Sequence, residues 1–82
     1  MTAPEQEPLH LRRIDVACNM RRFYTLAVQR TLFGEVSLIR RWGRIGTKGQ
    51  VKLETFGHSS EAEKALERLV RSKRRRGYAD VG

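Results

Sequence analysis

The sequence predicts an α+β fold in which an antiparallel β-sheet, connected as a meander, carries one C-terminal α-helix packed across one face. Between residues 9 and 56, apolar and polar side chains alternate along several short segments, which is the period of strands with one buried face. Glycine-containing turns separate the last three of these segments. After Gly57 the apolar residues recur at helical spacing instead. A chain of 82 residues has room for one such domain with a modest core.

The first two strands are expected at residues 9–16 and 23–30, with a turn at residues 19–22 between them. Residues 23–30 are rich in aromatic and β-branched side chains, which favour extended backbone. One face of this segment carries three apolar side chains at a period of two, so we expect that face to pack against the core. These side chains are Tyr24, Leu26 and Val28.

Two further strands are expected at residues 35–45 and 50–56, and Gly34 marks a hairpin at residues 31–35 that leads to the first of them. One face of the 35–45 strand begins apolar and ends cationic and aromatic, in the order Val36, Leu38, Arg40, Trp42. Three glycines follow at intervals of three and indicate a hairpin loop whose backbone turns sharply and lies close to another group. They are Gly43, Gly46 and Gly49.

A helix is expected to begin near Ser60 and to end before Gly77. Ser60 and Glu63 have the spacing of a capping box. Five apolar residues behind it form one stripe that faces the sheet, namely Ala62, Ala65, Leu66, Leu69 and Val70. Acidic residues in the first half and basic residues at the end complement the helix dipole, and Gly77 suits the position after the last turn. The sequence does not decide the conformation of residues 78–82.

The domain is expected to span residues 9–78, between a disordered acidic tail at residues 1–8 and a short tail at residues 79–82. Cys18 has no partner for an internal disulfide, and we interpret it as a small, half-buried apolar residue. The two histidines are far apart in the sequence, so neither a metal ion nor a cofactor is expected. No signal peptide or transmembrane segment is recognisable, which favours a cytoplasmic protein with no membrane partner.

Seventeen Lys and Arg residues against nine Asp and Glu residues give a net charge of +8, which predicts an anionic partner. An enzyme would need a nucleophile with a base, a pair of carboxylates at one site, or a metal, and the sequence offers none of these constellations. Residues 43–49 superficially resemble a phosphate-binding loop, but they lack its Gly-Lys-Ser/Thr ending and lead into a strand where that motif requires a helix. We therefore expect a protein that is not an enzyme.

The strongest functional signal is a group of cations around the single tryptophan, Trp42. Arginine forks bind phosphate oxygens, glycine amides add donors, and an indole offers a flat face to a sugar or base. The group comprises Arg40, Arg41, Arg44, Lys48 and Lys52. A second group at the end of the helix suits contact with a phosphate backbone, and comprises Arg71, Lys73, Arg74, Arg75 and Arg76. The alternative interpretation makes Trp42 a core residue, the arginines a solvated surface, and part of the second group a complement to the helix dipole.

A short motif at the end of the third predicted strand resembles the signature of the WGR domain family, found in poly(ADP-ribose) polymerases and in small bacterial proteins. The motif reads Arg41-Trp42-Gly43-Arg44-Ile45-Gly46, followed by Gly49-Gln50. Over roughly residues 9–78 the family pattern is also matched by Asn19, Arg22-Phe23-Tyr24, Phe56, Glu61-Ala62 and Lys73. The resemblance implies a twisted antiparallel sheet with one helix across it. It also implies DNA binding, with Trp42 stacking on the sugar of the terminal nucleotide at a strand break.

The resemblance does not carry every property of the family to this sequence. In the polymerases the signature arginine contacts neighbouring domains, whereas Arg44 is expected to contact phosphate or to act structurally. ADP-ribosylation belongs to a different domain of those enzymes.

We therefore expect a monomeric, stand-alone bacterial protein that binds nucleic acid, DNA rather than RNA, at strand-break ends, as in DNA repair. The expected contact residues are Trp42, Gly43, Arg44, Arg40, Arg41, Lys48, Lys52, Arg74 and Arg75. The alternative is a protein-interaction module that docks an acidic partner through the same surface.

Overall fold

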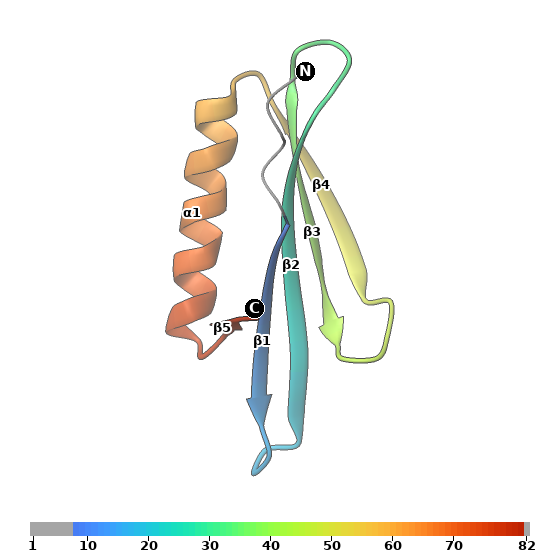
Figure 1. Ribbon diagram of the computed structural model, residues 1–82, viewed down its shortest axis with the longest axis vertical. Coiled ribbons are helices and arrows are strands. Elements are labelled where there is room, and N and C mark those ends of the chain that lie inside the picture. Colours follow the sequence, from blue (N-terminus) through green and yellow to red (C-terminus); the bar gives the residue numbers. More distant parts are fainter. Residues whose placement is uncertain (1–7, 82) are drawn as a thin grey trace.

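The computed structural model describes residues 8–81 and contains a five-stranded antiparallel sheet with one long helix on one side (Figure 1). In chain order the elements are β1 (Leu9–Asp15), β2 (Met20–Arg30), β3 (Val36–Arg44), β4 (Gln50–Phe56), α1 (Ser59–Arg75) and β5 (Ala79–Asp80). In the sheet the strands lie in the order β4-β3-β2-β1-β5. The α+β class with a C-terminal helix is thereby confirmed. Residues 1–7 of the expected tail lie outside the described residues.

Strand alternation gives the sheet two chemically different faces. The face packed against α1, here called the helix face, carries the core residues Leu11, Tyr24, Leu26 and Leu38, which meet Val70 of the helix. The opposite face, here called the open face, is not covered by α1. Its side chains in the middle of the sheet form the cross-strand rows His10-Thr25-Arg41-Val51 and Ala27-Ile39-Leu53.

The turn between β1 and β2 lies at residues 16–19, so the turn predicted at residues 19–22 is wrong. Asn19 takes the left-handed conformation, with φ of 49°, and its N–H donates to the carbonyl of Val16. The carboxylate of Asp15 accepts a hydrogen bond from the Cys18 N–H. These local bonds close the turn early and place the next three residues in β2. Cys18 is exposed at this turn, so the half-buried position expected for it is also wrong.

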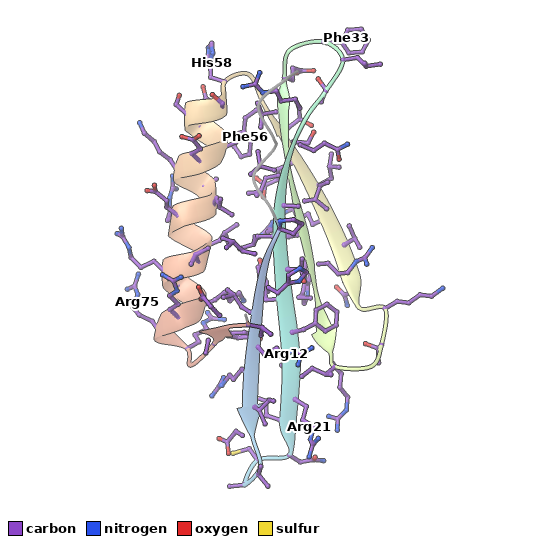
Figure 2. All side chains as sticks on the ribbon, viewed as in Figure 1. Arg12, Arg21, Phe33, Phe56, His58 and Arg75 are labelled. Carbon is purple, nitrogen blue, oxygen red and sulfur yellow. The ribbon has the colours of Figure 1, made fainter. Side chains whose placement is uncertain are left out.

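The two ends of α1 differ in how well the sequence predicted them. His58, at the start of the helix in Figure 2, is the N-cap residue, with an extended backbone and no side-chain capping bond. Ser60 therefore lies inside the helix, and the predicted capping box is wrong. At the other end Gly77 has φ of 99°, its N–H bonds to the Arg74 carbonyl, and the next N–H bonds to the Lys73 carbonyl. This pair of bonds forms a Schellman motif, which confirms the predicted stop.

The last described residues join the sheet. Ala79 and Asp80 form β5, which pairs with Leu11 and Arg12 of β1. The carboxylate of Asp80 accepts hydrogen bonds from Arg74 of the helix, with the shortest contact at 2.8 Å from Nη2. Residues 79 and 80 thus connect α1 to β1. The described part of the chain contains no helix with the length and apolar character that a membrane span requires.

Candidate nucleic-acid interface

A hollow of about 460 Å³ lies at the end of the sheet where β2 begins and β3 ends. The β1–β2 turn and the β3–β4 loop form its rim, and Arg21 beside the first of these turns is labelled in Figure 2. Its lining includes Trp42, the arginines of β2 and β3, and Tyr78 from the segment after the helix. These side chains come from β2, from β3 and from the segment after the helix, and pairing of β2 with β3 brings the first two sets together.

Trp42 is half-buried and belongs to an aromatic group of three rings. Its ring stacks on Tyr24, the residue directly opposite on β2, with centroids 6.1 Å apart and an angle of 22° between the planes. The ring of Tyr78 meets the ring of Tyr24 edge-on, with the two centroids 6.3 Å apart. Trp42 therefore packs against the core and also lines the hollow. The two interpretations of this residue, core and ligand contact, are compatible.

Three arginines lie side by side on the helix face at the end of the sheet. Arg22 of β2 is directly opposite Arg13 of β1 on one side and Arg44 of β3 on the other. Like charges placed directly across a sheet repel each other. The salt bridges among residues 8–81 are Arg40–Glu54 and Arg74–Asp80, so no carboxylate is paired with this arginine row. The row borders the aromatic group, because Arg22 and Arg44 lie two residues from Tyr24 and Trp42.

Lys73 adds a further cation to the same face from the C-terminal part of α1. Its Nζ lies 4.4 Å from the centroid of the Tyr24 ring and 5.6 Å from that of Tyr78. Burial lowers the pKa of Lys73 below its usual 10.5, and the positive charges of Arg76, Arg40 and Arg22 lower it further. The ammonium group thus lies among cations, in a position that a bound anion would stabilise.

Two glycines allow the β3–β4 loop to fold tightly against the end of β3. Gly49 has φ of 71°, and a Cβ there would overlap the carbonyl oxygen of Trp42 and lie 2.8 Å from Cζ of Phe23. A Cβ on Gly43 would lie 2.7 Å from the Cα of Gly49. The loop is also tied to β2, because the N–H of Ile45 donates to the carbonyl of Arg21. The close backbone approach predicted from these glycines is the approach of the loop to its own strand.

The residues predicted for the site divide into three groups. Trp42, Gly43 and Arg44 line the hollow. Arg40 and Arg74 bind carboxylates, the former through Nη2 at 2.9 Å from Oε1 of Glu54. The third group lies outside the lining of the hollow and comprises Arg41, Lys48, Lys52 and Arg75. Of these, Arg41 is on the open face of the sheet, and Arg75 is exposed at the C-terminal end of the helix (Figure 2).

Sequence reasoning missed three arginines and an aromatic residue at this end of the sheet. Arg13, Arg21 and Arg22 were assigned to a strand or a turn without a binding role, and Tyr78 to an undecided segment. Lys73 was expected to contact a phosphate backbone, but its position beside Tyr24 and Tyr78 was not predicted. The pairing register supplies the missing signal. Once Tyr24 is placed opposite Trp42, antiparallel pairing places Arg22, two residues earlier, opposite Arg44, two residues later.

Comparisons with known proteins identify the family of the chain. A family model of the WGR domain matches residues 7–82. The chain belongs to the WGR domain family. In poly(ADP-ribose) polymerases this family is linked to nucleic-acid binding. The WGR domain described by residues 8–81 also matches the fold of a crystal structure of a Bacteroides fragilis protein, with a TM-score of 0.79 and 26% identity over 93% of this chain.

Two curated bacterial proteins are similar in sequence to this WGR domain. The uncharacterized protein y4dW of Sinorhizobium fredii is 44% identical over 70 residues, or 85% of this chain. Protein YehF of Escherichia coli is 38% identical over 39 residues, or 48% of this chain. All three relatives are longer. The matched region covers 34% of y4dW, 14% of YehF and 20% of the Bacteroides fragilis protein.

Proposed function

We propose that this WGR domain is a non-catalytic module that binds nucleic acid, DNA in preference to RNA, at strand-break ends. The observation that carries the proposal is the arginine row, Arg13-Arg22-Arg44, which lies beside Trp42 and has no carboxylate partner within residues 8–81. Unpaired like charges on adjacent strands cost folding stability, and a phosphate backbone would remove that cost. The family's link to nucleic-acid binding in the polymerases supports the same ligand class.

The geometry gives each group a role in this proposal. The guanidinium groups of the row bind phosphate oxygens, which positions the strand without reading its sequence. Trp42 stacks on a terminal sugar or base at the hollow, supported from behind by the ring of Tyr24. Lys73 supplies a further charge near the two tyrosines. The outlying cations Lys48, Lys52 and Arg75 contact phosphates farther from the end.

The deciding experiment compares two ligands of the same sequence by fluorescence anisotropy at physiological salt. One is a 5′-phosphorylated blunt hairpin with one open end, and the other is the same duplex closed into a dumbbell. A clear preference for the hairpin supports end recognition. Equal and salt-sensitive binding would leave only non-specific DNA binding, and no binding to either would favour an acidic protein partner at the same surface.

A salt titration measures the electrostatic part of the proposal. If about five phosphates are neutralised, the logarithm of the association constant falls against the logarithm of salt concentration with a slope of roughly −4 to −5. A slope near zero would contradict phosphate contact even if binding were observed.

A further inference from the structure

Strand β4 (Gln50–Phe56) forms a free edge of the sheet. It pairs with β3 and, among residues 8–81, with no other strand, as its place at the rim in Figure 1 shows. Its seven residues contain neither proline nor glycine. Val51 and Leu53 on the open face are 54% and 58% exposed. Natural sheets usually protect such an edge, because its free N–H and C=O groups pair readily with another strand.

We propose that β4 pairs antiparallel with β4 of a second copy of this chain, about a two-fold axis at Leu53. In a continuous sheet that keeps both open faces on one side, paired residues must come from the same face. The two-fold axis is then perpendicular to the sheet and passes midway between one residue of the strand and the same residue of the second copy. With the axis at Leu53, all seven residues of β4 have a partner, and Lys52 lies directly opposite Glu54 of the second copy.

Neighbouring registers are less favourable for a physical reason. An axis at Lys52 places that ammonium opposite itself, and an axis at Glu54 does the same for the carboxylate. Like charges directly opposite each other destabilise a strand pair, whereas opposite charges stabilise it. An axis at Val51 or Thr55 leaves several residues of the strand without a partner. The register with the most backbone pairs is therefore also the register with complementary charges.

The side chains on both faces fit this pairing. On the open face, the row Ala27-Ile39-Leu53 ends at the edge, so the two copies would join their rows through the two Leu53 side chains. This contact removes exposed apolar surface from water. On the helix face, Glu54 accepts a hydrogen bond from Arg40 through Oε1. Its Oε2 has no such bond within residues 8–81 and is free to accept one from Lys52 of the second copy.

The test is sedimentation velocity over a wide concentration range, without nucleic acid, so its result is independent of the proposed function. The wild-type chain is expected to shift from monomer to dimer as concentration rises. Lys52→Glu and Glu54→Lys each create two like-charged pairs per dimer, and each is expected to weaken self-association about tenfold. An equimolar mixture of the two variants restores opposite charges across the axis, so a heterodimer as strong as the wild-type dimer is expected.

Lys48→Glu is the matched control, because it makes the same charge change in the loop before β4 and should leave dimerisation unchanged. Glu54→Lys also removes the bond to Arg40, so a thermal melt must show that it folds. If it does not, Leu53→Glu and Leu53→Lys repeat the test: each places like charges on the axis, and only their mixture should dimerise. A wild-type monomer at every concentration, as the sequence alone predicted, overturns the proposal, and so does a mixture that fails to associate.

Discussion

Arg22 and Arg44 lie directly opposite each other on β2 and β3, and Arg13 of β1 continues the row on the other side of Arg22. A pair of opposite charges at these positions would stabilise the sheet, but the sequence places three positive charges there. The repulsion is unfavourable for folding and favourable for binding an anion, because a bound phosphate would offset it. The same residues should therefore affect stability and binding in opposite directions.

Arg22→Gln is expected to stabilise the fold and weaken DNA binding. Removing the central charge relieves repulsion from both neighbours, which should raise the free energy of unfolding by about 0.2–1 kcal/mol. The loss of one phosphate contact should reduce the magnitude of the salt slope by about 0.9. Denaturant unfolding measures the first effect and anisotropy titrations at several salt concentrations measure the second.

Arg41→Gln is the control for that variant, because it removes the same charge from β3 at a position three residues from Arg44 and on the open face. We expect the salt slope and affinity for a hairpin end to change less than in Arg22→Gln. If the two variants lose affinity equally, DNA binds by overall charge and the helix face has no special role.

Trp42 is the only tryptophan, so its emission reports directly on the hollow. Stacking of a terminal sugar or base should change its fluorescence when the hairpin is added, while the dumbbell should have little effect. Trp42→Phe keeps an aromatic ring on Tyr24 and should preserve the fold. Trp42→Ala should weaken end binding by roughly fivefold to a hundredfold, given about 1–3 kcal/mol for stacking on one base. Unchanged emission in the presence of saturating hairpin would place the DNA elsewhere.

The strands and the two faces of the sheet were predictable because alternation is a local property of the sequence. Tyr24, Leu26 and Val28 were predicted to share the face that packs against the core, and they contact or form that core. The arginine row was not predictable in this way. Arg22 was assigned to a turn, whereas the turn closes at Asn19 and leaves Arg22 in β2. Its position opposite Arg44 depends on the register between β2 and β3, which alternation along one strand does not reveal.

Two other features, the start of α1 and the strand β5, also differ from the prediction. Ser60 and Glu63 match a capping box, but His58 has the extended backbone required of an N-cap residue, with φ of −135° and ψ of 145°. The helix therefore begins one residue before Ser60. Strand β5 has two residues, which is too short to show any alternation, and it forms because the chain after Gly77 turns back toward β1.

The loop glycines are expected to differ sharply in their tolerance of a side chain. Gly49→Ala combines a positive φ with overlap of the Trp42 carbonyl, so it should cost 2 kcal/mol or more, on the order of left-handed strain plus a steric clash. Gly46→Ala also has a positive φ, but a Cβ there meets open space, and about 1 kcal/mol is expected. Gly57→Ala, with no close neighbour, should be nearly neutral. Denaturant unfolding of the three variants checks this order.

The two ion pairs provide a second comparison of stability. Arg40 is 17% exposed in its pair with Glu54, and its Nε is buried with no hydrogen-bond partner among residues 8–81. Both members of the Arg74–Asp80 pair are more than half exposed. Glu54→Ala leaves a half-buried cation unpaired and should destabilise the fold by about 1–2 kcal/mol. Asp80→Ala should cost at most about 1 kcal/mol, because exposed pairs are screened by solvent. Equal losses in thermal or denaturant melts would contradict this ranking.

Lys73 should make stability and DNA binding respond to pH in opposite directions. Burial and three nearby arginines lower its pKa in the folded protein, so the unfolded chain holds the proton more tightly. Folding stability should therefore rise as pH increases from the lowered pKa toward 10.5, the unperturbed value. A bound phosphate favours the protonated form, so DNA affinity should fall over the same pH range, since the arginines stay charged.

Lys73→Met tests whether Lys73 causes both trends. This variant should bind DNA more weakly at neutral pH and lose much of the pH dependence of both stability and affinity. Lys64→Met, on the exposed N-terminal half of α1, removes the same charge away from the arginine row and should keep both trends. Anisotropy and denaturant unfolding, each measured between neutral pH and pH 10.5, provide the comparison. If Lys73→Met retains the full wild-type pH dependence, the titrating group is elsewhere and Lys73 does not bind the phosphate.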